Sequence, residues 1–494
     1  MHVAVVGGGV AGLGTALAAS RAGHQVTVVE RDATPMPESP DAAFAWDRRG
    51  APQVRHSHAF LARVRNLLVD RAPDVYAKLL EAGATELRFT DNLPPTLTDF
   101  EPRPGDERLC GLACRRTTFE WVLRRAVLDV PDVELVDGVA VDGLAAEALA
   151  ADGVLGSGSR ELFAVRGVRG RCAEGGRPYE LAADFVVDAT GPRTSSPAWL
   201  RDIGVEEPPE MLAPSEIIYL SRFYRFRDAH DAPDTTGPVG GDLGYLKYAV
   251  FAADNATFSI TFAVDAHDRE IRALTDADRF ERAASQIPAA RPWVDGRANA
   301  ITPVHAMAGL RNRRRWFVDT ERDDAPIVLG FAAVGDAHVC TNPLYGRGCS
   351  LALVHAYGLA DRLHLPPGER ERAFHRFTEA ELDPWFRAAV QQDREARELA
   401  TEGALATIDD SGNVDARAWL REVFREGLLP AIRTSPVVYR AFLRWFSLES
   451  PPDALMGDAD VIAAVMQSYS ERDSRPPEPP LGPDRAAFVA ALGA

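Results

Sequence analysis

The residues near the N-terminus have types and spacing that could bind a phosphate-containing ligand. Gly7, Gly9 and Gly12 form the pattern G-x-G-x-x-G, which encloses Val10 and Ala11, directly between an apolar strand and a small-residue helix. The first glycine permits a tight turn, the second lets a pyrophosphate approach the backbone, and the third lets the helix pack closely against the strand. The helix N-terminus adds partial positive charge. The pattern predicts a dinucleotide-binding turn; the alternative is a tight turn whose glycines serve packing only.

An acidic residue downstream supports the binding interpretation. Glu30 stands at the end of the second strand of this region, in the segment QVTVVERD of residues 25–32. A carboxylate at that position can accept hydrogen bonds from the ribose hydroxyls of an adenosine. An acid there also disfavours the phosphate of NADP in this particular site. Arg31 either flanks the ribose or forms a surface salt bridge.

A second turn, far along the chain, carries few large side chains. Residues 332–350 read AAVGDAHVCTNPLYGRGCS, in which an apolar strand is followed by Asp336 and then by Asn, Pro and two glycines before a helix-like run. An aspartate at a strand end, followed by so bare a turn, indicates that something large lies against the backbone. The turn alone does not say what that ligand is.

The elements that must position these turns are of two kinds. Near the N-terminus, strand, helix and strand form a βαβ unit, and residues 183–191 predict a further buried strand with a turn. From about residue 205 the segments 216–227 and 245–265 alternate at period two, with Asp254-Asn255 as a hairpin turn. One face of this second sheet is apolar and the other is polar. The chain is mostly helical from residue 366 onward.

Composition and charge exclude some classes of protein. The 494 residues carry a net charge of −17, which argues against nucleic acid as a partner. The five cysteines are an odd, scattered set that suits neither a disulfide framework nor a zinc site, and we expect no metal site. No apolar run reaches membrane-spanning length. The first strand begins at His2, which leaves no room for a signal peptide, so a cytoplasmic protein is expected.

With both turns in view, the chain resembles the FAD-dependent monooxygenase superfamily with the p-hydroxybenzoate hydroxylase type of fold. In that family a G-D-A motif, followed by Pro and G-x-G, closes over the ribityl chain of the flavin. The resemblance implies that Asp336 hydrogen-bonds the ribityl hydroxyls and that a helix beginning near Gly346 points at the flavin pyrimidine edge. The matching positions are Gly335, Asp336, Ala337, Pro343, Gly346 and Gly348, with the amides continuing to Cys349 and Ser350.

Three further parts of the sequence match positions of this family. The resemblance implies that Arg116 lies toward the FAD phosphates and ribityl chain, the alternative being a solvated arginine at a helix start. Val141 matches a position whose backbone meets the adenine. Aromatic hydroxylases carry an A-D-G sequence that touches both FAD and NAD(P)H, whereas this chain has DATG, which keeps Asp188 and Gly191. Direct reduction by NAD(P)H is therefore in doubt, and a separate flavin reductase is the alternative.

The resemblance to this family also concerns the substrate site. Residues 48–60, RRGAPQVRHSHAF, are similar to a segment of bacterial FAD epoxidases. His56 and His58 are candidates for a hydrogen-bond donor or acid beside the flavin, or are structural. Tyr345 either faces the substrate or packs. Flavin halogenases carry W-x-W-x-I-P and a catalytic lysine; this chain lacks the motif, and Lys78 reads as a solvated helix lysine, so halogenation is discounted.

The sequence therefore predicts an α/β fold with a Rossmann-type FAD-binding domain (GR2-like), an inserted mixed or antiparallel β-sheet substrate domain and a C-terminal helical region. We expect the FAD-binding domain to comprise residues 1–60, 108–204 and 325–365, the substrate part 61–107 and 205–324, and the helical region 366–494.

The expected function is that of an FAD-dependent monooxygenase. It would hydroxylate or epoxidise a hydrophobic small molecule of secondary metabolism through a flavin hydroperoxide. Because the reactive oxygen then belongs to the cofactor, no protein nucleophile is required. Tyr219, Phe223 and Tyr248 either line the substrate site or pack in the core. The alternatives are an FAD-dependent C=C reductase of the geranylgeranyl-reductase type and a non-catalytic prenyl-binding escort protein.

Overall fold

The fold is given by a computed structural model that describes residues 1–149, 162–233, 239–402, 415–477 and 480–493. Its centre is a five-stranded parallel sheet in the order β20-β9-β1-β2-β5. The strands are rich in valine and other apolar residues, which suits strands covered on both faces, although the edge strand β5 is only partly buried. Their bounds are β1 His2–Val6, β2 Gln25–Glu30, β5 Val133–Asp137, β9 Phe185–Asp188 and β20 Phe331–Ala333.

Different elements cover the two faces of the parallel sheet. Val3 and Val5 of β1 pack in the core formed with α1, α4 and α7, whereas Ala4 and Val6 face the core shared with a three-stranded antiparallel sheet. This alternation follows from the period of two along a strand. The covering elements are α1 Val10–Arg21, α4 Arg116–Leu128 and α7 Gly348–Ala360 on one face, and β6 Val139–Leu149, β7 Leu162–Cys172 and β8 Pro178–Ala182 on the other.

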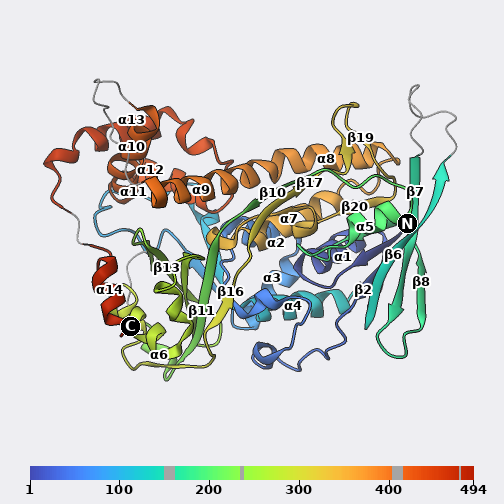
Figure 1. Cartoon of the computed structure of the whole chain (residues 1–494), viewed down its shortest axis with the longest axis horizontal. Coiled ribbons are helices and arrows are strands. Elements are labelled where there is room, and N and C mark those ends of the chain that lie inside the picture. Colours follow the sequence, from blue (N-terminus) through green and yellow to red (C-terminus); the bar gives the residue numbers. More distant parts are fainter. Residues whose placement is uncertain (150–161, 234–238, 403–414, 478–479, 494) are drawn as a thin grey trace.

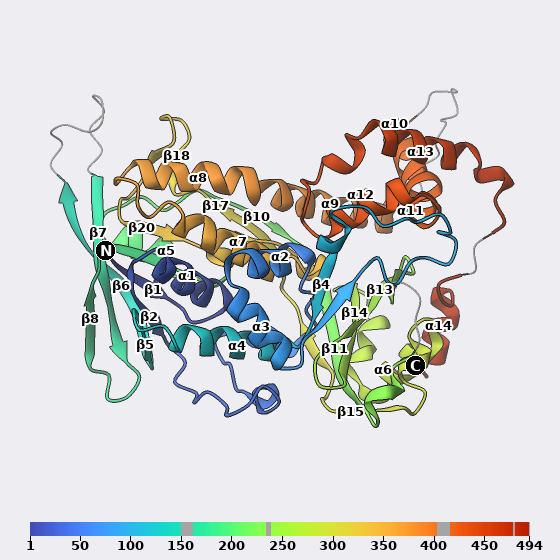
Figure 2. The ribbon, with the colours of Figure 1, turned by 180° about the vertical axis from the view of Figure 1, so that it is seen from behind.

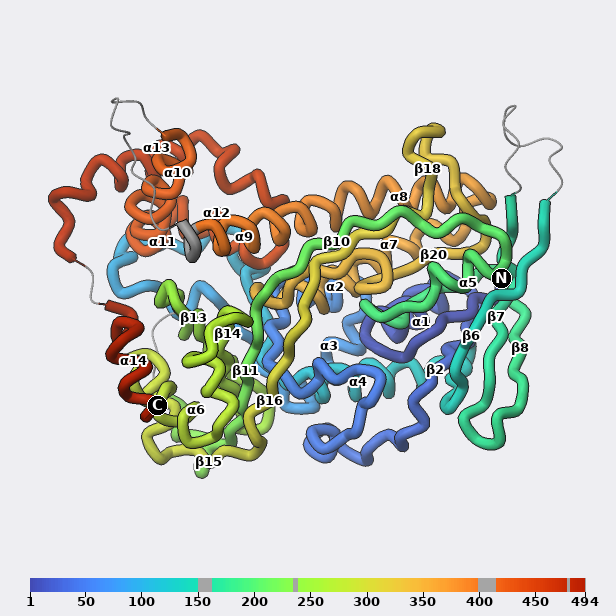
Figure 3. The backbone as a smooth tube through the Cα atoms, in the orientation of Figure 1, coloured from blue at the N-terminus to red at the C-terminus, as the bar shows by residue number. Residues whose placement is uncertain are grey.

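A six-stranded antiparallel sheet lies at the other end of the molecule (Figure 1). β10 and β17, five residues each, pair antiparallel within two stretches of chain that run between the two sheets (Figure 3). The bounds are β10 Glu210–Pro214, β11 Ile217–Phe226, β12 Gly240–Asp242, β13 Leu246–Ala252, β14 Thr257–Asp265, β15 Ala298–Ala300, β16 His305–Met307 and β17 Arg311–Arg315. The short strands are β3 Thr85–Arg88, β4 Cys110–Ala113, β18 Val318–Asp319, β19 Ala325–Pro326 and β21 Val339–Cys340.

The C-terminal part is helical, and α8 and α9 run from the parallel sheet to a helical group above the antiparallel sheet (Figures 1 and 2). The helices are α8 Glu369–Glu381, α9 Asp383–Glu402, α10 Ala416–Val423, α11 Leu429–Thr434, α12 Pro436–Phe446, α13 Ala459–Ser470 and α14 Arg485–Ala491. The others are α2 Ala62–Arg71, α3 Pro73–Glu81, α5 Ser196–Asp202 and α6 Ala277–Gln286. Within the described residues, no helix could span a membrane.

The predicted architecture is confirmed: a Rossmann-type parallel sheet, additional antiparallel sheets and C-terminal helices. The domain boundaries stay a prediction. Two features bear on them: α2 and α3 pack in the same core as the parallel sheet, and α14 returns to the antiparallel sheet, where Phe488 and Leu492 are buried.

Candidate cofactor and substrate site

The parallel sheet brings the two glycine-containing turns together. β1, β2, β9 and β20 are parallel, so their carboxyl ends meet at one edge of the sheet. The residues at or just after these ends are Gly7, Glu30, Asp188 and Gly335. A Cβ added at Gly335 would lie 2.9 Å from the Cβ of Ala11, so the turns are in contact although they are far apart in the sequence.

The glycines of the two turns meet different surroundings. A Cβ at Gly12 would lie 1.8 Å from the carbonyl oxygen of Gly7, which makes Gly12 indispensable for the close approach of α1 to β1. Gly7 itself has a φ of +106°, which disfavours any larger residue. By contrast, a Cβ at Gly9 or at Gly348 would meet nothing within 4 Å. These two glycines border open space at the starts of α1 and α7.

The helix ends at this edge fit a large anionic cofactor. No side chain caps the N-terminus of α1 at Gly9 or that of α7 at Arg347, so first-turn N–H groups remain available. α2, α3, α4 and α5 also lack a side-chain cap, so what sets α1 and α7 apart is the open space beside Gly9 and Gly348. The buried Nε of Arg116 and Oγ of Ser350 also have no hydrogen-bond partner among the described residues. The turns can therefore hold the phosphates and the flavin edge of FAD.

Arg116 is the centre of a buried ionic network. Its Nη2 donates to Oε2 of Glu120 at 3.0 Å, and its Nη1 lies 3.3 Å from Sγ of Cys349 at the start of α7. Arg48 donates to the other oxygen of Glu120 at 2.7 Å. Burial alone would raise the pKa of Glu120, but Arg48 and Arg116 together hold it below its ordinary value. The network keeps Arg116 charged beside the two turns.

Glu30 is buried at the end of β2 and already holds backbone groups. Its two oxygens accept hydrogen bonds from the N–H groups of Gly8 and Asp32, both at 2.8 Å, and Arg48 approaches at 3.5 Å. A carboxylate has further lone pairs, so Glu30 can still accept ribose hydroxyls. Arg31 is exposed beside it. The ribose role of both residues stays a prediction.

Asp336 lies where the G-D-A motif turns back toward α7. Burial raises the pKa of its carboxyl to about 6, and the guanidinium of Arg116 opposes that shift. The turn is held from behind by His355, whose Nδ1 accepts from the N–H of Gly335 at 3.2 Å and whose Nε2 lies 3.0 Å from Oγ1 of Thr378. Asp336 is thus fixed next to an arginine at the cofactor edge.

The remaining predicted cofactor residues lie around the same edge. Asp188 is fully buried and accepts from N and Oγ1 of Thr190 at 2.9 and 2.6 Å, so it shapes the turn that contains Gly191. Val141 lies in β6 at a register shift against β7. Pro343 begins the short 3₁₀ turn that leads to Gly346, whose φ is +66°.

Residues 56–58, here called the histidine segment, lie between the second turn and the antiparallel sheet. A Cβ at Gly346 would lie 2.6 Å from that of Ala59. His56 Nδ1 lies 3.1 Å from Oγ of Ser221, and His58 Nδ1 lies 2.9 Å from the carbonyl oxygen of His56. Burial, helped by His305, lowers the pKa of His56 to about 4; burial, helped by Arg116, lowers that of His58 to about 3. Both rings are therefore neutral at pH 7.

The polar face of the antiparallel sheet, not the apolar one, faces this segment. Oγ of Ser57 lies 2.7 Å from that of Ser259 and 2.6 Å from Oγ1 of Thr261, which is 2.8 Å from Oγ of Ser221. The apolar face instead packs on α6 and α14; its members are Phe258, Ile260 and Phe262, with Phe280 and Phe488 from the helices.

This arrangement separates the three aromatic residues for which core packing and substrate lining were both expected as alternatives. Tyr248 pairs with Phe262 and belongs to the helix-packed core, so it does not share the polar face. Tyr219 and Phe223 are in register with Ala263 and Ser259, on the polar face. The alternation of residues predicted two faces, but only packing decided which one turns toward the flavin edge.

The C-terminal helices contribute residues that the sequence did not reveal. Asp393 of α9 is buried and accepts from the side-chain amides of Asn312 and Asn342, both at 2.7 Å. Oδ1 of Asn342 also accepts from the hydroxyl of Tyr219 at 3.0 Å. Asn342 immediately precedes Pro343, so α9, β17 and the antiparallel sheet together hold the second turn.

Arg347 is enclosed by aromatic side chains. Its guanidinium carbon lies 4.5 Å from the ring centroid of Tyr345, 4.7 Å from that of Trp385 and 5.7 Å from that of Trp445. Burial lowers the pKa of Arg347 to about 10. Such cation–π contacts favour the charged form inside a poorly solvated environment. Tyr345 therefore packs against Arg347.

A buried ion pair orients the antiparallel sheet relative to α4. Asp254, at the hairpin before β14, accepts from the backbone N and from Nε and Nη2 of Arg115 at 2.5, 3.0 and 2.6 Å. Thr118 adds a hydroxyl at 2.8 Å. Arg115 directly precedes Arg116, so the sheet is fixed at the cofactor edge itself.

Some of these residues carried a sequence signal and others carried none. Arg116, Glu120 and Arg124 recur every four residues and so share one face of a helix that also carries many apolar residues, which would have pointed to a buried charged stripe. Asp254 was recognised only as a turn residue. Asp393 sits among many charged residues of α9, and nothing local distinguishes it from its exposed neighbours.

Comparisons with known proteins agree with this geometry. The chain is 27% identical over 478 residues to Protein Rv3254 of Mycobacterium tuberculosis, with 90% of this chain and 89% of that protein covered. In fold it is similar to the probable FAD-dependent monooxygenase PqsL of Pseudomonas aeruginosa, with a TM-score of 0.53, 19% identity and coverage of 81% of this chain and 97% of that chain. It is similar in the same way to the myxobacterial chondrochloren halogenase CndH, with a TM-score of 0.55, 17% identity and coverage of 92% and 97%.

The family assignment follows from a match that covers more than half of the chain. The family described as FAD dependent oxidoreductase matches residues 2–362, which contain both glycine turns, Glu30, Arg116 and Asp336. This confirms FAD as the cofactor and an oxidoreductase as the class of enzyme. The chain belongs to the FAD dependent oxidoreductase family.

Proposed function

We propose that this oxidoreductase is a monooxygenase that inserts oxygen into a hydrophobic small molecule. The observation that carries the proposal is the position of His56, Ser57 and His58, between the second flavin turn and the polar face of the antiparallel sheet. When bound, FAD supplies the electrons and the means to activate oxygen. A substrate would lie at this junction, where backbone and neutral side chains surround the flavin edge.

The protein's own residues would bind, orient and keep water out. His56 and Ser221 offer a neutral hydrogen-bonding pair at 3.1 Å, and both are buried. Neutral rings can orient a substrate hydroxyl or carbonyl without attracting bulk counterions. Arg116 and the uncapped N-terminus of α7 place positive charge where a reduced flavin carries negative charge.

The expectation against halogenation concerns a catalytic lysine beside the flavin, and this chain has two lysines. Lys78 lies on α3 and pairs with Asp129 at 2.8 Å, with 39% of its side chain exposed. Lys247 pairs with Asp242, and a third of its side chain is exposed. Lys247 lies on the polar face of the antiparallel sheet, since it and Tyr219 are both in register with Ala263. The expectation against halogenation therefore rests on the missing W-x-W-x-I-P motif, and the likeness to halogenases supports the fold.

The reductant is proposed to be NADH or NADPH, used directly or through a separate flavin reductase. The test is to mix the FAD-loaded protein with each nucleotide anaerobically, follow loss of flavin absorbance, and then admit labelled O₂ with a panel of aromatic and polyene compounds. A monooxygenase puts the label into a panel compound and consumes oxygen with it. Product formed without oxygen would instead establish the C=C reductase, and a protein that takes up no FAD would establish the escort.

A further inference from the structure

A second cluster of chemically capable side chains lies away from the flavin edge, behind α8. His375 and Glu379 are four residues apart on α8 and so share one face of the helix. Asp324 faces them from the turn between β18 and β19, where its φ is +52°. Each of the three offers one ligand atom, and these atoms all lie within 4.8 Å of one another.

The buried histidine nitrogen is aimed at the two carboxylates. Nε2 of His375 lies 3.6 Å from Oδ1 of Asp324 and 3.5 Å from Oε2 of Glu379. The His375 side chain is only 3% exposed, and Nε2 has no hydrogen-bond partner within the described part of the chain. A buried ring nitrogen without a partner is costly, which calls for a ligand at this point.

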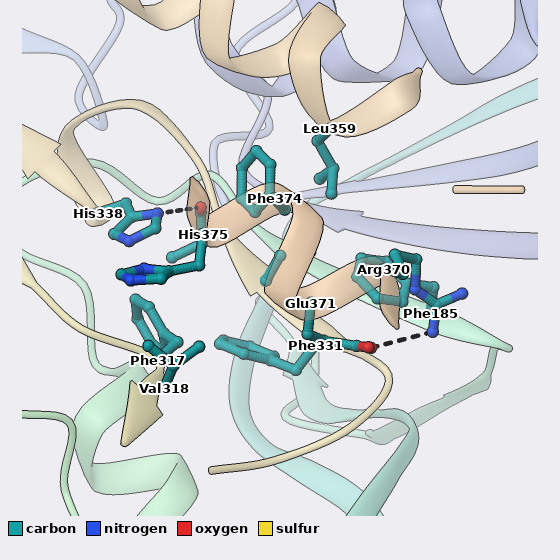
Figure 4. A pocket seen from close by; sticks show the side chains of 12 residues that line it. Phe185, Phe317, Val318, Phe331, His338, Leu359, Arg370, Glu371, Phe374 and His375 are labelled. Carbon is teal, nitrogen blue, oxygen red and sulfur yellow. Dashed lines mark hydrogen bonds and ion pairs between the residues drawn. The ribbon is translucent and has the colours of Figure 1, made fainter. Parts of the chain in front are cut away.

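The surroundings hold the ring in this position. His375 lines an apolar pocket with Phe317, Phe331 and Phe374, and Figure 4 shows its ring next to Phe317. The nearby Arg314 is paired with Asp383 at 2.6 Å, so its charge is already balanced. Asp324 and Glu379 therefore leave a local excess of negative charge at the cluster, with 33% and 42% of their side chains exposed to admit an ion.

We propose that His375, Glu379 and Asp324 form a divalent cation site of the Zn²⁺ type, which ties the β18–β19 hairpin to α8. Ligand atoms about 2.0–2.1 Å from a tetrahedral Zn²⁺ lie about 3.3–3.5 Å from one another, close to the two separations found here. One imidazole and two carboxylates suit Zn²⁺ better than Mg²⁺, which prefers oxygen ligands in an octahedron. The fourth position would hold water. This proposal departs from the expectation of no metal site, which rested on the scattered cysteines.

The position of the site gives it a structural consequence. α8 also supplies Thr378, which contacts Nε2 of His355 at 3.0 Å, and Phe374, whose ring stacks on that of His355 at 4.6 Å. His355 holds the N–H of Gly335 in the flavin turn. An ion on the adjoining face of α8, where His375 is one turn from Thr378, would therefore brace the helix that supports the G-D-A turn.

The test uses the tag-free, full-length, FAD-loaded protein, stripped with a chelator and titrated with ZnCl₂ by calorimetry. We expect one saturable site, a rise in Tm of about 2–5 °C at saturation, and slower hydrogen exchange in residues 318–326. MgCl₂ at the same concentrations should produce none of these three effects. His375→Gln should weaken Zn²⁺ binding by on the order of 100-fold, and Glu379→Gln by at least about tenfold.

The matched control is Asp323→Asn, the neighbour of Asp324 in the same turn, which should bind Zn²⁺ as the parent does. Flavin absorbance and circular dichroism verify that each variant is folded. A parent protein without a saturable site would overturn the proposal. So would a folded His375→Gln protein with unchanged affinity, since the ion would then sit elsewhere, for example on a cysteine.

Discussion

At the scale of single residues, two glycines of the first turn are needed for different reasons, one for folding and the other for cofactor binding. A Cβ at Gly12 would collide with the backbone of Gly7 at 1.8 Å, whereas one at Gly9 would enter open space next to α1. The first position is set by how β1 and α1 pack, and the second by what must lie against the backbone. The same motif thus contains both kinds of glycine.

Substitution of these glycines should give two distinct results. We expect Gly12→Val to give little soluble, folded protein, because the valine side chain would separate α1 from β1. Gly9→Ala should fold with an unchanged Tm in the flavin-free state but bind FAD about tenfold or more weakly, because the methyl group occupies the space for the pyrophosphate. Flavin fluorescence titration measures this. Gly143→Ala, where a Cβ would also meet nothing, is the control and should change neither quantity.

Asp336 makes a pH-dependent contribution to stability in the flavin-free protein. Its pKa rises from 3.8 to about 6 on folding, so between these values the folded state holds more protons than the unfolded chain. The free energy of unfolding therefore falls as pH rises from about 4 to about 6. At pH 7, Asp336→Asn should be more stable than the parent by about 1–2 kcal/mol, within the ~3 kcal/mol that two pKa units represent.

Denaturant unfolding of flavin-free protein between pH 4 and 7 measures the Asp336 effect. The advantage of Asp336→Asn should grow through that range, whereas Glu174→Gln in the exposed β7–β8 turn should track the parent. A constant difference would show that the carboxyl is not buried. With FAD present the order should reverse, because an amide replaces a carboxylate that we predict to bind ribityl hydroxyls.

At the scale of elements, the second turn depends on helices that follow it in the sequence. α9 provides Asp393, and Trp385 and Trp445 from α9 and α12 enclose Arg347. The C-terminal helices are thus part of the wall behind the flavin turn. They bring no recognisable motif, because their contribution is a set of contacts and not a local pattern.

Removal of the α9 carboxylate should loosen that turn. Asp393→Ala leaves the buried amides of Asn312 and Asn342 without their acceptor, at a cost of about 2–4 kcal/mol in unfolding free energy. We also expect faster hydrogen exchange in residues 339–350 and weaker FAD binding. Glu395→Ala, on the exposed side of α9, should leave all three unchanged. Unaltered exchange in Asp393→Ala would mean that α9 does not hold the turn.

At the scale of the whole molecule, two contacts join parts of the chain that are far apart in the sequence. The Arg115–Asp254 pair joins the FAD-binding region to the antiparallel sheet, and α14, near the C-terminus, covers the apolar face of that sheet. Phe488 is fully buried there, with its ring 5.4 Å from that of Tyr245. The sheet beside the proposed substrate site therefore needs the C-terminal helix to complete its core.

Truncation of Phe488 should therefore destabilise the antiparallel sheet, whose strands are far from the C-terminus in the sequence. Phe488→Ala removes a buried ring at a cost of about 3–5 kcal/mol to the local stability of the sheet. Hydrogen exchange across β11, β13 and β14 should speed up, while the parallel sheet keeps its protection. Val489→Ala, a neighbouring and only partly buried position, is the control. Equal exchange in both variants would show that α14 is not part of that core.

The sequence alone determined the features that are written locally. Glycine spacing, strand periodicity and an acid at a strand end predicted the βαβ unit and the two turns, because a tight turn or a close approach needs particular residues at adjacent positions. The resemblance carried by the two turns predicted the FAD-dependent oxidoreductase family. Arg116 and Asp336 were named by resemblance, and their roles toward FAD stay predictions that the geometry supports.

The tertiary structure alone decided which surfaces meet. A period of two shows that a strand has two faces, but not that Phe258, Ile260 and Phe262 lie under helices while Ser259 and Thr261 contact Ser57. Asp393 gains its role from Asn342, and His375 from Asp324, each some fifty residues away in the chain. Such contacts depend on how distant elements pack, and packing leaves no local pattern in a sequence.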